Sequence, residues 1–303
     1  MHNLSDVIKL YKNELEIIKN ASKKTIENYM HWLGRFLGWW WDKDVKLINK
    51  IDIWLYQLYL KEKWLSVKTI NYHIIALRTL LKFCADYDIE CISHERLKIA
   101  KIWANNPSFL EEYEADMILE APYIYTDNLT KRARDLAILH ILYGTGLRVS
   151  ELCSMTYDDI RIDDPNLDKQ KQFSIIGKWS KLRSVFMTNM AMEAMTERLE
   201  IRRWLTNNSK YIFVSLSNNI NNGNSLTRSS VEDIVQYYVK SAWITKKTTP
   251  HTLRHSFATK LLTKWIDIRQ VQMLLWHASI TTTQIYTHVS DKMLSVAHDV
   301  MNS

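Results

Sequence analysis

Apolar residues spaced three and four apart run through most of this chain, and this periodicity constrains its fold more than any other feature. Such spacing puts the apolar side chains on one face of a helix. In the first hundred residues it occurs over 4–11, 22–37, 51–63 and 66–87. This part of the chain therefore predicts an all-helical bundle, with a polar cap around Ser22 at the start of the second helix.

The helical pattern breaks at 101–110, where Asn105 and Asn106 precede Pro107. Clusters of this kind are typical of a connection between folded parts. We place a domain boundary there, with a helical domain over 1–104 and a second domain over 107–303. A length of 303 residues agrees with two domains of roughly 150 residues each.

The second domain is also expected to be mainly helical, but it contains one stretch of a different kind. Residues 172–187 alternate apolar and polar side chains around Gly177, which predicts a β-hairpin. A short strand is expected over 211–215 and a polar loop over 207–224. The expected helices cover 111–120, 131–142, a segment from 148 or 149, 229–242, 250–264, 268–275 and a segment after 290. The fold class is thus mainly α with a small β-hairpin, an α+β second domain.

The charge balance favours a polyanionic partner. Lys and Arg number 40 and Asp and Glu 33, a formal charge of +7. Residues 1–106 carry 17 basic and 12 acidic side chains, so this part is net +5 and is the more basic per residue. An excess of this size also occurs in ordinary basic proteins, so charge alone does not decide the partner.

The cysteines and the N-terminus predict an intracellular protein. Cys84, Cys91 and Cys153 have no zinc-type spacing and are odd in number, so we expect reduced thiols in a cytoplasmic protein. The N-terminus lacks the apolar core of a signal peptide. No apolar run approaches the ~18 residues of a membrane span, and no membrane association is expected.

One predicted helix carries a concentrated set of donors. Thr249 followed by Pro250 is typical of a helix start. His251, Arg254 and His255 then lie at i, i+3 and i+4 and share one face. Histidines four residues apart can bind zinc, but the arginine beside them would repel a cation and no acidic ligand is near in sequence. The arginine suits an oxyanion, and no metal site is expected.

Three further segments carry related residue types. Arg148 follows the turn Gly144-Thr145-Gly146 at the mouth of a helix. Lys178 lies at the tip of the predicted hairpin, and His277 and Tyr286 lie near the C-terminus. Each of these signals is weak alone, because a single tyrosine or lysine usually belongs to a core or a surface.

Taken together, these residues resemble the tyrosine recombinase (phage-type integrase) family. The resemblance rests on the ordered set Arg148, Lys178, His251, Arg254, His277 and Tyr286, and on the sequence motifs GTGLRVSEL and TPHTLRHSFAT that contain some of them. Within the family these motifs are most similar to those of the Xer-type site-specific recombinases. The resemblance covers the whole second domain, whereas the first domain resembles the family's helical, SAM-like core-binding domain in size and helix count only.

The resemblance implies a role for each of the six side chains. Tyr286 is the implied nucleophile, which forms a 3′-phosphotyrosyl bond with DNA and frees a 5′-hydroxyl. Arg148 and Arg254 would stabilise the charge on the phosphate oxygens. Lys178 would protonate the leaving oxygen, His251 would exchange the tyrosine proton, and His277 would hydrogen-bond the phosphate. The phosphotyrosyl bond conserves the energy of the broken linkage, so no cofactor is expected.

Other residues have two open interpretations. Glu151 either orients the basic groups, as the resemblance implies, or simply favours a helix start. His255 is treated as structural and His288 as non-catalytic. Lys68, Arg78 and Lys82 on the 66–87 helix are either DNA contacts or members of a solvated helix face.

The resemblance also implies partners. Two domains would clamp double-stranded DNA as a C shape, and four subunits, of this chain or with a paralogous recombinase, would act on two duplexes. A DNA translocase could serve as regulator, and the segment after Tyr286 would dock on a neighbour or on its own subunit.

The expected role is resolution of chromosome or plasmid multimers, in chromosome partition and cell division. The alternatives are an integrase of a mobile element and a DNA-binding protein that no longer cuts.

The composition contains an anomaly, 6 glycines beside 12 tryptophans. Tryptophan stands where the family pattern has glycine at five positions: Trp64, Trp179, Trp243, Trp265 and Trp276. Several of these are expected at turns or helix ends, where glycine provides positive φ. Either the enzyme is altered, or the gene is decaying, or UGA, translated here as tryptophan, is read as glycine in the source organism. Clustering at glycine positions favours the third explanation.

Overall fold

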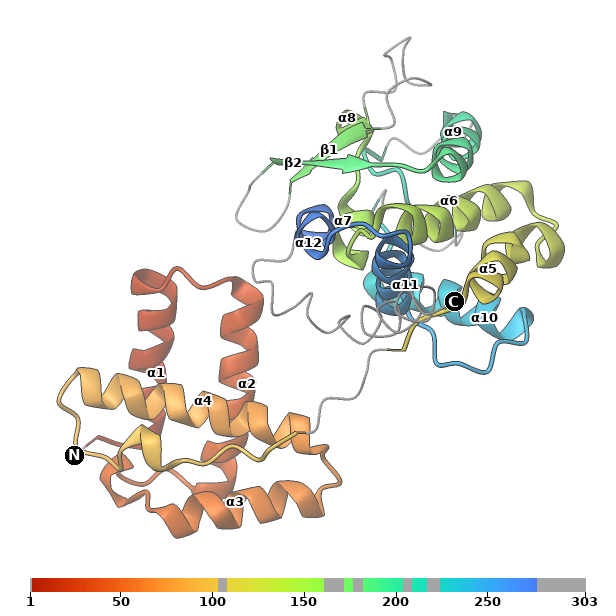
Figure 1. The fold of residues 1–303 in the computed structure, drawn as a ribbon. Coiled ribbons are helices and arrows are strands. Elements are labelled where there is room, and N and C mark those ends of the chain that lie inside the picture. The colour runs from red at the N-terminus through yellow and green to blue at the C-terminus, as the bar shows by residue number, and fades with distance from the viewer. Residues whose placement is uncertain are drawn as a thin grey trace. The chain divides into compact units, whose positions relative to one another are not determined.

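The computed structural model describes residues 2–102, 108–160, 172–176, 182–203, 209–216 and 224–276. The chain divides into two compact units, Met1–Asn105 and Asn106–Ser303. Figure 1 shows the helices of each unit, and the two units are described separately below.

The first unit is all-helical in its described part, as predicted. Its α-helices are α1 (Leu4–Asn13), α2 (Lys23–Trp40), α3 (Lys50–Glu62) and α4 (Val67–Asp86), with a π-helical turn at Glu14–Ile18 and 3-10 turns at Val45–Leu47 and His94–Arg96. Polar side chains start three of them. Ser22 and Ser66 accept bonds from the backbone N–H groups of the third helical residue, and Asn49 does the same for α3.

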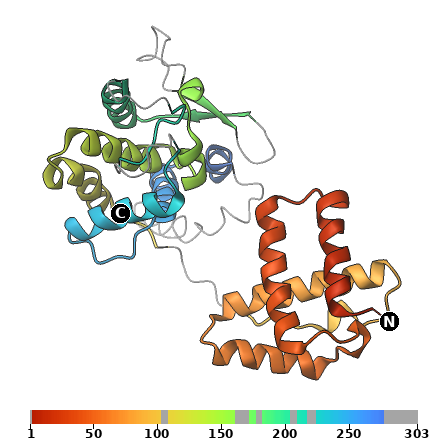
Figure 2. The same cartoon turned by 180° about the vertical axis from the view of Figure 1, so that it is seen from behind.

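A continuous apolar core joins these helices. In Figures 1 and 2, α1 and α2 lie side by side and α4 packs across them. A polar pair lies within this core, because the Tyr56 hydroxyl and His73 Nδ1 are 3.0 Å apart. Burial, together with the charge of Arg35, lowers the pKa of His73 from 6.5 to about 4. The histidine is therefore neutral at physiological pH.

The second unit contains helices and one hairpin. Its elements are α5 (Glu112–Tyr125), α6 (Leu129–Thr145), α7 (Val149–Ser154), α8 (Tyr157–Ile160), β1 (Gln172–Ile176), β2 (Leu182–Phe186), α9 (Asn189–Arg203), α10 (Arg228–Ser241), α11 (Pro250–Thr263) and α12 (Ile268–Leu275). The strands pair antiparallel from Gln172 with Phe186 to Ile176 with Leu182, which confirms the predicted hairpin. Its tip lies outside the described residues.

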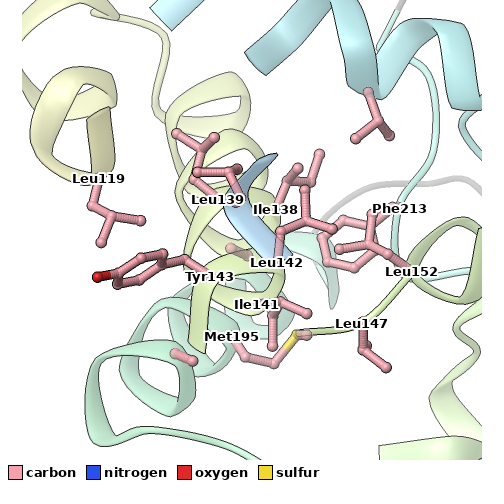
Figure 3. Close-up of a cluster of buried hydrophobic side chains, with 14 of the residues drawn as sticks. Leu119, Ile138, Leu139, Ile141, Leu142, Tyr143, Leu147, Leu152, Met195 and Phe213 are labelled. Atoms are coloured by element: carbon pink, nitrogen blue, oxygen red, sulfur yellow. The ribbon is translucent and has the colours of Figure 1, made fainter. Parts of the chain in front are cut away.

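Helix α6 is the centre of the second core. It is buried from Ala133 to Thr145 and packs against α9, α5 and α11. Figure 3 shows Ile138, Leu142 and Leu147 in this cluster, near Phe213. The core thus fixes the C-terminal end of α6, where the Gly144-Thr145-Gly146 turn begins.

Three expectations for this unit were wrong or incomplete. Residues 211–215 do not form a strand, because Tyr211 and Val214 each make only an isolated bridge. Helix α5 continues beyond 120 and through Pro122, since one proline removes a single helical hydrogen bond. Helices α8 and α9 were not predicted. Among the described residues, no helix combines the length and apolar character needed to cross a bilayer.

The cysteines agree with the sequence prediction. All three are free, with Cys84 and Cys153 buried and Cys91 half-buried. Burial raises the pKa of Cys84 to about 12 and that of Cys153 to about 11. Both thiols therefore stay protonated at neutral pH, as expected for core residues.

The suspected glycine positions have left-handed backbone. Among the described residues, seven other than glycine have positive φ, and five of them are tryptophans. Four are Trp64, Trp243, Trp265 and Trp276, at φ of 58–62° for the first three and 53° for the last. The fifth is Trp41, at φ 72°, which the sequence did not single out. The glycine-type backbone expected at Trp64, Trp265 and Trp276 is confirmed, Trp243 shares it, and Trp179 lies outside the described residues.

Candidate active site

The start of α11 brings the predicted donors together. The Thr249 hydroxyl accepts the backbone N–H of Thr252 at 3.2 Å, and Pro250 occupies the first helical position. On the next turn the rings of His251 and His255 have centroids 4.2 Å apart, which confirms that they share a face. His251 is exposed, whereas Arg254 and His255 are buried.

Arg254 connects the ends of two other helices to α11. Its two terminal nitrogens donate to backbone carbonyls, one to Gly146 at the end of α6 and the other to Leu275 at the end of α12, the latter at 2.5 Å. The side chain is only 3% exposed, so its orientation is fixed by packing and by these two bonds. The last carbonyls of a helix lack intrahelical donors and carry partial negative charge, which suits a guanidinium.

Arg148 is held at the start of α7 by Glu151. The Glu151 carboxylate accepts the backbone N–H of Arg148 at 2.8 Å and one terminal nitrogen of its guanidinium at 2.9 Å. The other terminal nitrogen of Arg148 donates to the backbone carbonyl of Trp276 at 3.1 Å. The carboxylate therefore both caps the helix and orients the arginine. The two interpretations of Glu151, a helix-start carboxylate and a group that orients a basic side chain, are compatible with each other. The Arg148 side chain is 42% exposed and can reach a ligand in solvent.

The two arginines therefore converge on the end of α12. Leu275 and Trp276 are consecutive residues. The Leu275 carbonyl accepts a hydrogen bond from Arg254, and the Trp276 carbonyl accepts one from Arg148. Two guanidinium groups and one carboxylate leave the group net positive. An oxyanion with oxygens in a forked geometry is the ligand that such a pair of arginines prefers.

The glycine turn before Arg148 is sterically required. A Cβ on Gly144 would lie 2.7 Å from the Thr188 hydroxyl oxygen. Gly146 has φ 64°, and a Cβ there would lie 2.6 Å from the Phe257 ring of α11 and 2.8 Å from Leu275 of α12. Only glycine allows α6, α11 and α12 to meet closely enough for Arg254 to bond to both helix ends.

The remaining predicted side chains divide into two groups. Lys178, His277, Tyr286 and His288 lie outside the described residues. Lys68, Arg78 and Lys82 lie on α4 of the first unit, with both lysines exposed and the arginine half-buried. Tyr72, between Lys68 and Arg78 in the sequence of α4, is 40% exposed and stacks on Trp32 of α2 with ring centroids 5.4 Å apart. Helix α4 therefore carries three cations and one member of an aromatic pair.

The two histidines of α11 raise the question of a metal site. In the part of the chain that the structure describes, no three His, Cys, Asp or Glu side chains lie close enough together to hold a metal ion. The two histidines of α11 have a buried arginine between them in sequence. The donor set of this region thus fits an anion better than a cation.

Comparison with known families decides the assignment. Residues 108–293 match the phage integrase family, and residues 9–90 match the N-terminal SAM-like domain of phage integrases. The chain belongs to the phage integrase family. It is a site-specific recombinase of the tyrosine type, since its relatives along nearly the whole chain are tyrosine recombinases.

Two relatives illustrate the similarity of this recombinase. It is 31% identical to tyrosine recombinase XerC of Pediococcus pentosaceus, with 97% of this chain and 96% of the relative covered. It is 35% identical to tyrosine recombinase XerA of Pyrococcus furiosus, with 98% and 94% covered. The similarity therefore includes both units.

Solved structures agree with the fold. A crystal structure of XerA recombinase is 29% identical and superposes with a TM-score of 0.55, covering 99% of this chain and 98% of the other. The Tn1549 transposon integrase, solved in complex with transposon right end DNA, is 20% identical with a TM-score of 0.75, covering 96% and 99%. The prediction of a mainly helical recombinase fold with a small hairpin is confirmed.

Sequence reasoning missed the backbone groups of this recombinase's site. The carbonyls of Gly146, Leu275 and Trp276 orient both arginines, but a carbonyl has no sequence signature of its own. The available signals were the glycine turn at 144–146 and the expected helix end at residue 276. The predicted side chains Arg148, Glu151 and Arg254 do lie together.

Proposed function

We propose that this recombinase cuts one DNA strand by attack of the Tyr286 hydroxyl on a backbone phosphate. A bond forms between the tyrosine oxygen and phosphorus, and the bond from phosphorus to the 5′-oxygen breaks. The tyrosine proton passes to a base, and the leaving 5′-oxygen takes up a proton. Attack of a 5′-hydroxyl on the phosphotyrosyl bond reverses these steps and rejoins the strand, so the net reaction needs no external energy source.

One observation carries the proposal: Arg148 and Arg254 converge on the same helix end in an orientation fixed by carbonyls and a carboxylate. Attack on a phosphodiester gathers negative charge on its nonbridging oxygens. Arginines oriented before the substrate arrives stabilise this charge without reorganisation during the reaction. Glu151 acts in support, because it fixes the guanidinium of Arg148.

The remaining roles rest on the family resemblance. We assign Lys178 as the acid that protonates the 5′-oxygen, and His277 as a donor to the phosphate. His251 exchanges the tyrosine proton, which agrees with its exposed place one turn before Arg254 on α11. Lys178, His277 and Tyr286 lie outside the described residues, so mutagenesis has to test them.

The substrate we propose is double-stranded DNA, contacted by both units. The 1–104 part would act as a core-binding domain and the 107–303 part as the catalytic domain. Lys68, Arg78 and Lys82 would neutralise phosphates from α4, with the Trp32–Tyr72 stack beside them. The similar XerH recombinase structure is bound to its difH substrate and the Tn1549 transposon integrase structure is in complex with transposon right end DNA, which supports this substrate class. The C-shaped clamp remains a prediction.

We propose that the biological role is resolution of chromosome or plasmid multimers in the cytoplasm, where the DNA substrate is. Xer recombinases are similar to this chain at 31–35% identity over nearly its full length, which favours this role over a mobile-element integrase. The active form would be a tetramer on two duplexes, built from this chain or shared with a paralogue. A DNA translocase is the proposed regulator.

A nicked suicide substrate tests the chemistry. Duplexes that bind the protein are first selected from a randomised pool, and a nick is then placed next to the cleaved phosphate so that the freed fragment diffuses away. The wild-type protein should form a covalent adduct that survives denaturing electrophoresis, whereas Tyr286→Phe should bind the same duplex and form none. Tight binding without an adduct for the wild-type would instead favour a DNA-binding protein that no longer cuts.

A further inference from the structure

The end of α12 has an unusual double function in the hydrogen-bond network. The Leu275 carbonyl accepts a hydrogen bond from Arg254 at 2.5 Å, and the Trp276 carbonyl accepts one from Arg148 at 3.1 Å. In a continuing helix both carbonyls would accept amides four residues later. They are available to the arginines because the helix ends here, at a residue with φ 53° and ψ 47°.

We propose that the left-handed end of α12 positions both active-site arginines, and that the residue it requires at 276 is glycine. This inference rests on the proposed function of Arg148 and Arg254. The matching end of α6 supports it, since Gly146 is also left-handed, at φ 64°, and also presents its carbonyl to Arg254. Two left-handed helix ends thus face one guanidinium.

Tryptophan is poorly suited to this position. In the left-handed region the Cβ of an L-residue crowds the following carbonyl oxygen, a penalty that glycine does not have. If residue 276 relaxes to an extended conformation, its carbonyl rotates away and the bond from Arg148 is lost. The Trp276 side chain is 44% exposed, so burial of the indole does little to offset the strain.

The first test compares variants at residue 276 in single-turnover cleavage of the suicide duplex at saturating DNA. Trp276→Gly should raise the adduct-forming rate by roughly five- to thirty-fold, the range that the left-handed penalty implies, with little change in Kd for the duplex. Trp276→Ala removes the indole but keeps Cβ, so it should gain little. Trp276→Val should lose activity. Equal gains for alanine and glycine would show that bulk matters and would overturn the proposal.

A matched control and a second measurement separate this inference from the proposed function. Trp64→Gly relieves the same backbone strain in the first unit, so it should raise Tm without changing the cleavage rate. Side-chain ¹⁵N signals of Arg148 and Arg254 report guanidinium order without DNA. They should sharpen in Trp276→Gly and broaden in Trp276→Val. Sharpening without any adduct would refute the proposed chemistry alone, and unchanged signals would refute the positioning role.

An independent observation concerns all five tryptophans with positive φ. Each of the five follows a helix: Trp41 after α2, Trp64 after α3, Trp243 after α10, Trp265 after α11 and Trp276 after α12. Their side chains are 44–95% exposed, whereas Trp40, inside α2, is 5% exposed. Trp41, at φ 72° and ψ 167°, occupies a region that is essentially restricted to glycine.

Three of these ends share one hydrogen-bond pattern. The N–H of Trp64 donates to the Lys61 carbonyl, and the next residue, Leu65, donates to Leu60. Trp243 with Ile244 and Trp265 with Ile266 repeat this pair of bonds. It is the Schellman motif, in which glycine is the usual left-handed residue and an apolar residue follows.

We infer that these five positions carry glycine in the natural protein, through UGA codons that the source organism reads as glycine. The gene should have UGA at 41, 64, 243, 265 and 276 but UGG at 32, 39, 40 and 54, which lie within helices. The intact mass of the protein purified from its source should fall by the tryptophan-to-glycine difference at each UGA position. UGG at the five helix ends, or tryptophan there by mass, would overturn the inference.

Discussion

Arg254 shows how a single side chain can connect several helices of the second unit. It is 3% exposed, and its described bonds run to the carbonyls of Gly146 and Leu275 on two other helices. A buried guanidinium needs several acceptors, and helix ends provide them without adding another charge. The same residue thus contributes to packing and, in the proposed function, supplies positive charge for a phosphate.

Arg254→Lys should reduce both stability and cleavage. A lysine ammonium is a compact point charge and cannot bridge the two carbonyls as the planar fork does. We expect the cleavage rate to fall roughly 100-fold or more, comparable with the loss of one transition-state donor, and Tm to fall as well. Single-turnover adduct formation and thermal unfolding measure the two effects. Wild-type cleavage by the lysine variant would contradict the assigned role.

Glu151→Gln tests how far the orientation of Arg148 depends on the charge of its carboxylate partner. The amide oxygen can still cap the backbone N–H of Arg148, but the ion pair at 2.9 Å loses its negative charge. Cleavage should slow by roughly tenfold while Tm changes little, because the Arg148 side chain is 42% exposed and such pairs contribute little to stability. A large fall in Tm with an unchanged rate would indicate a purely structural carboxylate.

At this scale the sequence allowed the side chains to be predicted but not their backbone partners. Arg148 and Arg254 were identified by the text around them, and Glu151 by its distance of three residues from Arg148. The partner carbonyls could not be found, because they become acceptors only when two helix ends meet in three dimensions.

At the scale of elements, local signals were reliable and non-local ones were not. The helix caps at Ser22 and Thr249 depend only on residues close in sequence, and so does the alternating pattern of the hairpin. These elements form as predicted. Helix α9 was not predicted because its buried face includes Arg198 and Arg202. These charged residues interrupt the apolar periodicity from which a helix is predicted. The 211–215 segment resembles a strand in sequence, yet among the described residues it makes only the single bridges of Tyr211 and Val214.

The first unit should lose stability in mild acid through His73. Its folded pKa is about 4 against 6.5 when exposed, so the unfolded chain binds a proton that the folded chain does not. The contribution is fully present above pH 6.5 and declines as pH falls toward 4. At ~1.4 kcal/mol per pKa unit the loss approaches about 3 kcal/mol. Urea unfolding of the full chain at pH 7, 6 and 5 measures it.

His73→Gln is the matched control for this effect. The glutamine amide can still bond to the Tyr56 hydroxyl but has no proton to gain, so the difference in unfolding free energy between variant and wild-type should narrow as pH falls. Parallel pH dependence in the two proteins would show that other groups are responsible.

For the whole molecule, the distribution of charge predicts how DNA binding responds to salt. The 1–106 part carries net +5 of the total +7, and α4 presents Lys68, Arg78 and Lys82. Each phosphate that a cation neutralises contributes about 0.9 to the slope of log K against log salt. Binding of duplex DNA should therefore weaken steeply as salt rises.

Replacing Lys68, Arg78 and Lys82 by alanine should reduce that slope by up to about 2.7, or about 0.9 for each phosphate that is no longer neutralised. Fluorescence anisotropy of a labelled duplex over a salt series gives the slope. Lys12→Ala, at an exposed position of α1, serves as a surface control. An unchanged slope in the triple variant would assign these residues to a solvated face.

The central claim is that two fixed arginines serve a tyrosine that joins itself to DNA. Peptide mapping of the adduct on the nicked duplex tests it most directly, because the nucleotide mass remains on the attacking residue. We expect the DNA remnant on the tryptic peptide that contains Tyr286, attached to the tyrosine oxygen. A remnant on any other residue, or no covalent product from a protein that binds the duplex, would contradict the account.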